Sequence, residues 1–303
     1  MDQEKKSIYE EISSGGDGKG SGKIQPENMD LLHQRLFETV CYFHDFCEEH
    51  GLRYFIDGGT LIGAVRGQDF VPWDDDLDVA MLRPDFNKLF ELWDEYGDKE
   101  NFSLYRTTDD FCAYAPIGLM RNNNSTWVRE FEAGLTDRNL GVKIDIDPLD
   151  EIPDDKGKRR IQKLYAYPYV LYLTQRKAKL RETKIRRIGS AVGLALVKSK
   201  SLRNKILHVC AKHVQKYNGT GCKRVAINGF GYVRDKSVFD NREKVMLHGR
   251  EFYAPGNYDA YLTRYYGDYM TKPPVEERIP LDEPYYFDLN TPAREYLASK
   301  AKG

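Results

Sequence analysis

Two segments near the start of the chain constrain its fold more than any other feature. The first runs from Phe55 to Arg66 and places two adjacent glycines directly after a short apolar stretch. The second runs from Val71 to Met81 and carries four aspartates between apolar flanks. An acidic run in a solvated loop would not need such flanks. This order predicts a strand, a tight turn, a short helix and then a second strand that carries carboxylates.

Three of the four aspartates are expected to share one face. Successive side chains of an extended segment alternate, so Asp74, Asp76 and Asp78 point one way while Asp75 and Leu77 point the other. Three like charges on one face repel one another unless a cation lies between them. Carboxylate oxygens are ligands that Mg²⁺ or Mn²⁺ prefers, so the pattern predicts a divalent-metal site for phosphoryl chemistry.

The first segment offers groups that could hold a phosphate. Gly58 and Gly59 let backbone N–H groups approach it without side-chain obstruction, and a helix that starts near Thr60 adds its N-terminal dipole. Arg66, at the far end of that helix, either neutralises phosphate charge or forms an ion pair with the aspartates. Arg121 follows a predicted strand and is a second candidate phosphate ligand, although a surface arginine is an equal alternative.

A further carboxylate is expected from a later strand. The segment from Val142 to Asp150 places Asp145 and Asp147 on one face. Asp145 stands between two isoleucines and is the better candidate for binding metal or for accepting a hydroxyl proton. The predicted metal ligands are therefore Asp76, Asp78 and Asp145, with Asp74 and Asp147 as additional candidates.

The order of the elements predicts an α+β fold with helices flanking a small mixed β-sheet. We expect residues 1–26 to be disordered, 27–155 to form the catalytic core, 156–217 to be a basic helical region, and 218–303 to pack on the core. Helices are predicted at 27–50, 61–66, 84–96 and 258–266, and strands at 53–57, 77–82, 102–106, 113–120, 126–131 and 141–147.

Composition and cysteine usage indicate where such a chain would work. The 303 residues are 41% hydrophobic and carry a formal charge of −1, and no apolar run approaches the ~18–20 residues of a membrane span. The start of the chain has no apolar signal region, and five scattered cysteines favour reduced thiols. We expect a cytoplasmic protein, either free or peripheral at the inner face of the plasma membrane.

The near-neutral total conceals a charge separation. Residues 156–216 contain 18 Lys or Arg and one acid, a net charge of +17, which leaves −18 on the remainder. The simplest interpretation is a charged helical face exposed to solvent. The functional interpretation is that the segment contacts anionic lipid headgroups or a lipid-diphosphate acceptor. A nucleic-acid-binding module is a less favoured alternative, because no RNA- or DNA-binding motif accompanies the basic segment.

Three stretches together resemble the LicD family of bacterial phosphocholine transferases, which are related to the animal fukutin-type ribitol-phosphate transferases. They are Gly-Gly-Thr-Leu-Ile-Gly-Ala-Val-Arg, Pro-Trp-Asp-Asp-Asp-Leu-Asp-Val-Ala-Met and Ile-Asp-Ile-Asp-Pro-Leu-Asp. The late segment 249–270 also resembles that family. The resemblance implies a nucleotidyltransferase-like fold. It also implies transfer of a phospho-alcohol, phosphocholine foremost, from a CDP donor to a sugar hydroxyl with release of CMP. The implied acceptor is a cell-surface glycan such as teichoic acid, capsule or lipooligosaccharide, free or linked to a lipid.

The resemblance also assigns residues. Asp76 and Asp78 match the metal-binding Asp-x-Asp pair of the family, and Asp74 matches an acidic position of the same cluster. Asp145 matches the carboxylate of the later motif. The chain departs from the family at two places, because Gly67 stands where many members have His and Asp147 stands where they usually have Phe.

The substrate stays open at this level. Choline, ribitol and glycerol are all compatible, and a nucleotidyltransferase that attaches a nucleotide to a sugar, protein or small molecule would use the same metal ligands. A choline-specific site needs aromatic faces around the quaternary ammonium, for which Trp73 and Trp127 are candidates.

Overall fold

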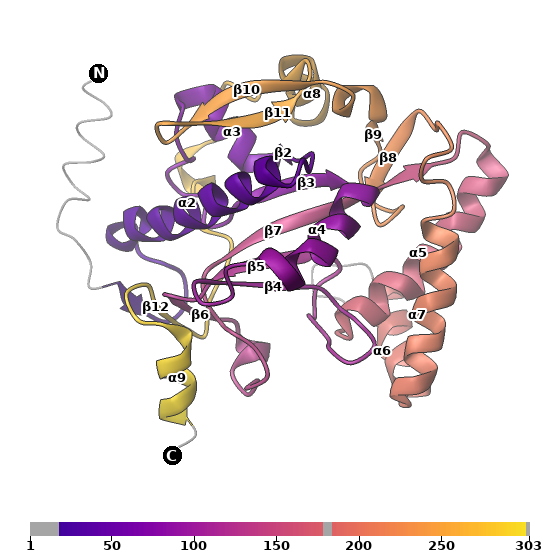
Figure 1. Cartoon of the computed structure of the whole chain (residues 1–303), viewed down its shortest axis with the longest axis horizontal. Helices are drawn as coiled ribbons and strands as arrows, with labels where there is room; N and C mark the ends of the chain where they lie inside the picture. Colours follow the sequence, from indigo (N-terminus) through magenta and orange to yellow (C-terminus); the bar gives the residue numbers. More distant parts are fainter. Residues whose placement is uncertain (1–17, 178–183, 301–303) are drawn as a thin grey trace.

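The structure is a computed structural model that describes residues 18–177 and 184–300 (Figure 1). Its centre is a mixed sheet in the order β2-β3-β7-β5-β4, to which β8 and β9 are added. The predicted α+β class is confirmed. The strands of this sheet are β2 (Phe55–Ile56), β3 (Asp78–Leu82), β4 (Phe102–Tyr105), β5 (Gly118–Asn122), β7 (Lys143–Ile152), β8 (Arg224–Ile227) and β9 (Arg234–Asp235).

The parallel pairing of β3 with β7 positions the polar residues of the sheet. Its register places Asp78 opposite Asp145 and Leu82 opposite Leu149. The other pairs of the sheet, including β2 with β3 and β5 with β7, are antiparallel. Since side chains alternate along β7, Ile144 and Ile146 enter the core while Asp145 points to the opposite face.

Three helices follow or precede these strands. They are α2 (Pro26–Glu49), α3 (Gly58–Gly67) and α4 (Arg83–Tyr96). Both α2 and α4 pack against the sheet, and in Figure 1 they cross in front of it. The apolar spacing that predicted α2 is the spacing of its buried face, and its innermost residues are Leu32, Leu36, Val40 and Phe43.

The basic region 156–217 is helical, as predicted. It comprises α5 (Lys156–Thr174), α6 (Lys184–Leu196) and α7 (Lys200–Val214). Helices α5 and α7 pack along each other and form an apolar cluster separate from the main core, at the side of the molecule away from α9 (Figure 1). Within residues 18–177 and 184–300, no helix has the length and apolar character that crossing a membrane requires.

The C-terminal part covers two places on the core. A hairpin of β10 (Arg242–Leu247) and β11 (Arg250–Pro255) lies over α3, and α8 (Tyr258–Tyr266) follows it. A second small sheet pairs β1 (Lys19–Gly20), β12 (Tyr286–Asp288) and β6 (Thr126–Val128), with α9 (Ala293–Lys300) beside β6.

Three expectations about local structure are corrected. The disorder predicted for residues 1–26 is wrong for residues 18–26, because β1 pairs with β12 and α2 begins at Pro26; residues 1–17 lie outside the described part. The strand expected from 113 begins only at Gly118. The short helix expected at 61–66 begins earlier, at Gly58.

Arg121, a predicted phosphate ligand, is instead a structural residue of the core. Its side chain is 1% exposed and its Nη2 lies 2.6 Å from Glu132 Oε1. Nη1 donates to the Gly141 carbonyl at 3.0 Å, and Arg129 Nη2 reaches the same Glu132 oxygen at 2.7 Å. A guanidinium enclosed in this way cannot reach a phosphate, so that prediction is wrong.

The Glu132 cluster makes the stability of the fold depend on pH. Burial alone would raise the pKa of Glu132, but the charge of Arg121 and hydrogen bonds from Arg129 lower it from 4.5 to about 2. A lowered folded-state pKa gives stability that is fully present above pH 4.5 and is lost as the pH falls toward 2, on the order of 3 kcal/mol. Glu132→Gln should therefore be several kcal/mol less stable than the native protein at pH 7, because it leaves Arg121 buried without a carboxylate.

Urea denaturation of both proteins at pH 7, 4 and 3 measures this difference. We expect the gap to narrow at the acidic end, where Glu132 itself becomes protonated. Asp110→Asn, which removes a 98% exposed carboxylate whose partner Lys200 is also exposed, is the control and should change little. A gap that stays constant with pH would show that Glu132 is not the ionised partner of Arg121.

Candidate active site

Aspartates from three separate segments converge where β3 and β7 begin. Asp78 opens β3 and is the register partner of Asp145, which places the two backbones about 5 Å apart. The charges that act most strongly on Asp78 are those of Asp76, Asp147, Asp145 and Asp57. The predicted convergence of the two carboxylate segments is therefore present. With Asp74, which acts on Asp76, the cluster comprises Asp57, Asp74, Asp76, Asp78, Asp145 and Asp147.

The alternation predicted for residues 74–78 also holds. Asp75 turns away from the cluster, and its carboxylate accepts the N–H groups of Leu281 at 3.2 Å and Asp282 at 2.7 Å. Leu77 enters the core. Asp74 and Asp78 instead lie against the start of α3. The C-terminal segment therefore binds the acidic run on the side of Asp75, and the aspartate cluster lies on the opposite side.

The adjacent glycines make room for these carboxylates. A Cβ atom on Gly59 would lie 2.1 Å from Asp74 Oδ2, and one on Gly58 would lie 2.9 Å from Asp78 Oδ2. Gly58 also has a φ of +57°, a conformation that side-chain-bearing residues rarely adopt. The Gly-Gly pair is thus required by the close approach of Asp74 and Asp78 to the N-terminus of α3.

Asp57, which was not predicted, organises this N-terminus. Its Oδ1 accepts the Gly58 N–H at 2.9 Å and the hydroxyl of Tyr261 at 2.6 Å, and its Oδ2 lies 2.9 Å from Arg234 Nη2. Asp57 is therefore the cap of α3, which begins at Gly58 and so two residues before the start expected near Thr60. Thr60 Oγ1 accepts the backbone N–H of Asp78 at 3.0 Å and ties the helix to β3.

Burial and mutual repulsion raise the free energy needed to ionise the carboxyl groups of the cluster. Burial, followed by the charge of Asp76, raises the pKa of Asp74 to about 8. Burial likewise raises the pKa of Asp147 to about 7, although Arg234 acts in the opposite direction. The pKa of Asp78 is raised well above its usual value for the same reasons. A divalent cation among these side chains would relieve the repulsion.

Two basic side chains already neutralise part of the charge. Lys143 is 9% exposed, and its Nζ lies 2.7 Å from Asp145 Oδ1. Burial alone would lower the pKa of Lys143, but the Asp145 carboxylate raises it. Arg234 pairs with Asp57, and its buried Nη1 has no hydrogen-bond partner among the described residues. That nitrogen is a donor available to an anionic ligand at the cluster.

The donor chemistry suits a hard divalent ion, since the side chains that gather here are carboxylates. Within the described residues, however, no three His, Cys, Asp or Glu side chains are arranged to hold an ion as they stand. The Lys143–Asp145 ion pair also occupies one of the carboxylate oxygens of the cluster.

The remaining predicted site residues lie apart from the cluster. Arg66 donates to the Tyr269 carbonyl, and its nearest charges are Arg278 and Asp268 rather than the aspartates. Arg278 lies over the ring of Trp73 at 5.4 Å from its centroid, so one face of that predicted aromatic is already used by a cation.

Trp127 does not contact a ligand in the way predicted. It is 3% exposed and packs against Phe287, with 5.7 Å between ring centroids. This packing joins β6 to β12 in the core, so the assignment of Trp127 as a choline-contacting residue is wrong.

Residues 51–132 match the family model described as "LicD/FKTN/FKRP, nucleotidyltransferase domain". Over 274 residues the chain is 28% identical to the lipopolysaccharide cholinephosphotransferase LicD of Haemophilus influenzae, covering 83% of this chain and 97% of that protein. Residues 51–132 are therefore similar to the LicD-family domain. Its similarity to the human ribitol 5-phosphate transferase FKRP, 39% identity, spans 57 residues, or 19% of this chain and 12% of that protein.

The resemblance inferred from the motifs is thus confirmed. The matched region contains the Gly-Gly pair and the first acidic segment, whereas Asp145 lies beyond its end. The strand pairing between β3 and β7 is what connects Asp145 to that region.

Some site residues carried a sequence signal and others did not. Asp57 directly precedes a glycine pair at a helix start, a position that favours a capping aspartate. Lys143 stands two residues before Asp145 in a strand and therefore shares its face. Arg234 and Tyr261 come from distant segments, and tertiary packing alone brings them to Asp57.

The close approach at Gly59 can be tested against a matched glycine. Gly59→Ala should be destabilised by about 1–3 kcal/mol, because the new Cβ displaces Asp74. Gly67→Ala, at the other end of α3, meets nothing within 4 Å and should be neutral or slightly stabilising. Thermal unfolding of the two variants measures this. Equal melting temperatures would contradict the packing of Asp74 against α3.

Proposed function

We propose that the protein transfers a phospho-alcohol, phosphocholine foremost, from a CDP-activated donor to a sugar hydroxyl of a cell-surface glycan, releasing CMP. The observation that carries this proposal is the convergence of Asp76, Asp78 and Asp145 beside the N-terminus of α3. The similarity of the chain, along most of its length, to a lipopolysaccharide cholinephosphotransferase also supports the proposal.

Each group at the site has a role in this reaction. Asp76, Asp78 and Asp145 would hold Mg²⁺ or Mn²⁺, which neutralises charge on a diphosphate when bound. Asp57 accepts the N–H of Gly58, so the next N–H groups of α3, at Gly59 and Thr60, face negative charge favourably because helix amides there have no intrahelical partners. In this arrangement they and the free Nη1 of Arg234 hold the donor phosphates.

The chemical step is an in-line displacement. The acceptor oxygen attacks the phosphorus that bears the alcohol, its proton passes to Asp145, and the bond to the CMP oxygen breaks. Most of the rate gain comes from positioning and from neutralising charge.

A candidate contact for the alcohol is Tyr266. Its side chain is 47% exposed, and the pKa of its hydroxyl is raised to about 12 by burial and then by the charge of Asp57, with Asp78 and Asp147 acting in the same direction. An aromatic ring beside carboxylates suits a quaternary ammonium, which both groups attract.

The principal rival is a nucleotidyltransferase, which would leave the nucleotide half on the acceptor. A donor labelled separately in its cytidine and alcohol parts distinguishes the two reactions. Label from the alcohol on the acceptor supports phospho-alcohol transfer, and label from cytidine supports the rival.

Removal of one central carboxylate should abolish transfer. With CDP-choline and Mg²⁺, Asp78→Asn should be at least about 100-fold slower than the native protein. It should also lose the stabilisation that CDP-choline with Mg²⁺ gives the native protein in thermal unfolding. Asp110→Asn, whose carboxylate is 98% exposed, is the control. Comparing the transfer rates with CDP-choline, CDP-ribitol and CDP-glycerol in the same assay identifies the alcohol. Full activity of Asp78→Asn would refute the assignment of the aspartate cluster as the active site.

We further propose that the basic helices bring the enzyme to an anionic membrane surface, where a lipid-linked acceptor would reside. On α6, Ile188, Val192 and Leu196 are 65%, 48% and 77% exposed and recur every four residues, so they form one apolar stripe. The stripe lies within the segment of net charge +17. An exposed apolar stripe flanked by Lys and Arg is typical of helices that lie in the interface of anionic bilayers.

Vesicle sedimentation tests this surface. Native protein should bind phosphatidylglycerol vesicles at low salt and detach as salt rises, because lipid charge contributes part of the attraction. Replacing Ile188 and Leu196 by Ser should weaken binding about tenfold or more, whereas Val275→Ser, which removes a 71% exposed apolar residue elsewhere, should not. Equal binding by both variants would remove α6 from the contact.

A further inference from the structure

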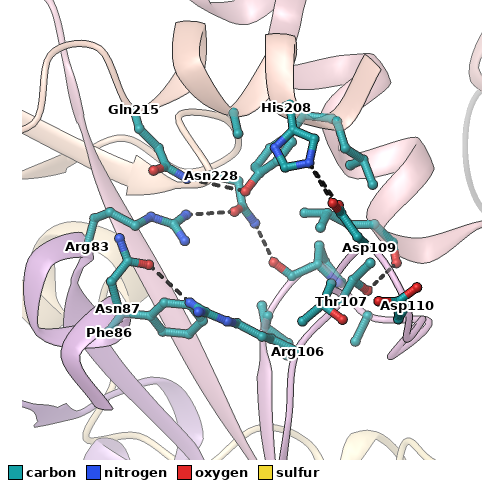
Figure 2. Close-up of a pocket in the computed structure, with 18 residues that line it drawn as sticks. Arg83, Phe86, Asn87, Arg106, Thr107, Asp109, Asp110, His208, Gln215 and Asn228 are labelled. Atoms are coloured by element: carbon teal, nitrogen blue, oxygen red, sulfur yellow. Dashed lines mark hydrogen bonds and ion pairs between the residues drawn. The ribbon is translucent and has the colours of Figure 1, made fainter. Parts of the chain in front are cut away.

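A second cavity lies away from the aspartate cluster. It has a volume of about 460 Å³ and is enclosed by α4, the segment 106–117, α5 and α7 (Figure 2). Arg83, which directly follows β3, and Asp150 of β7 lie at its inner end and stand five residues beyond Asp78 and Asp145. Five strand residues span roughly 17 Å, so the cavity is separate from the candidate active site.

Arg83 is held rigidly at the inner end of this cavity. Its side chain is 6% exposed; Nε lies 2.9 Å from Asp150 Oδ1, and Nη2 lies 2.7 Å from Oδ2. Nη2 also donates to Asn228 Oδ1 at 2.9 Å, and Asn228 in turn donates to the Pro116 carbonyl at 2.7 Å. The remaining nitrogen, Nη1, makes no hydrogen bond to any described residue. A buried guanidinium of the cavity lining therefore has one N–H₂ group to offer.

Arg106 supplies a second guanidinium. It is half-buried, lies over the Phe90 ring and donates to Asn87 Oδ1 at 3.3 Å, but it pairs with no carboxylate of the described residues. Burial, followed by the charge of Arg83, lowers the pKa of Arg106. Figure 2 shows both guanidinium groups reaching the cavity beside Asn87. Two arginines that feel each other's charge in a cavity favour an anion between them.

The acidic residues of the cavity do not cancel this preference. Asp109 and Asp110 lie at its rim, where His208 Nε2 is 2.8 Å from Asp109 Oδ1 and Lys200 Nζ is 3.3 Å from Asp110 Oδ1. Each rim carboxylate thus has a basic partner of its own, and Asp150 is already paired by Arg83.

Part of the remaining wall is apolar. It is formed by Phe86, Ile117, Tyr169, Leu173, Leu207 and Ala211. A volume of this size, apolar walls and a few fixed polar groups are the usual features of a small-molecule site. The wall leaves room for an apolar or planar portion of a ligand whose charged end meets the arginines.

We propose that this cavity binds a small organic oxyanion, with its phosphate or carboxylate held by Arg83 and Arg106 and its apolar part against Phe86 and Tyr169. The site is additional to the proposed transfer reaction and does not depend on it. A ligand seated there would contact Arg83, which directly follows β3 and is hydrogen-bonded to Asp150 of β7.

Isothermal titration with phenyl phosphate, benzoate and inorganic phosphate tests the proposal on the full chain. We expect phenyl phosphate or benzoate to bind more tightly than inorganic phosphate, because only the former two fill the apolar part. The tighter of the two identifies the anionic group. Arg106→Gln should weaken that binding about tenfold or more, since it removes a charge-assisted hydrogen bond. Arg294→Gln, an exposed arginine of α9, is the matched control and should bind as the native protein does.

A second comparison separates this cavity from the aspartate cluster. Binding of the aromatic probe should persist without divalent metal and in Asp78→Asn, whatever becomes of the transfer activity. Absence of binding at millimolar concentration, equal binding by Arg106→Gln, or a requirement for Asp78 or metal would each overturn the proposal.

Discussion

The parallel pairing of β3 with β7 is the constraint on which the rest of the molecule depends. Its register places Asp78 beside Asp145 at one end of the two strands. At the other end it brings Arg83, the first residue of α4, to Asp150. A one-residue slip would turn every one of these side chains to the wrong face, so burial of Ile144 and its neighbours fixes the polar site as firmly as it fixes the core.

The cluster at the start of these strands opposes folding, and the surrounding residues limit that cost. Buried carboxylates that repel one another destabilise a protein unless each gains a partner. Asp57 gains the Gly58 amide, Tyr261 and Arg234, and Asp145 gains Lys143. In the proposed reaction, the charge that stays uncompensated would attract a cation and, through that cation, a diphosphate. The repulsion that costs stability would then also serve the chemistry.

The sequence predicted the parts of this site that depend on local pattern. Alternation along the chain separated Asp74, Asp76 and Asp78 from Asp75. The helix predicted at 258–266 has the same bounds as α8. The predictions for Arg121 and Trp127 were wrong for one shared reason. A charged or aromatic side chain at a strand looks the same in sequence whether it meets a ligand or a buried partner. The partners, Glu132 and Phe287, become visible only in the folded chain.

The departure at Asp147 acquires a physical explanation in the same terms. The family that the motifs resemble is expected to carry Phe there, whereas this chain has a carboxylate that shares a face with Asp145. Arg234 acts on Asp147 in the direction that favours its ionised form, and it also pairs with Asp57. Asp147 adds a negative charge to the wall of the site and makes that wall more polar. Because Arg234 acts on this charge, the net charge of the wall changes by less than the substitution alone suggests. In the proposed reaction, the wall of the site is charged and hydrogen-bonding at this position, where an aromatic ring would make it apolar. That difference would bear on which alcohol or acceptor fits.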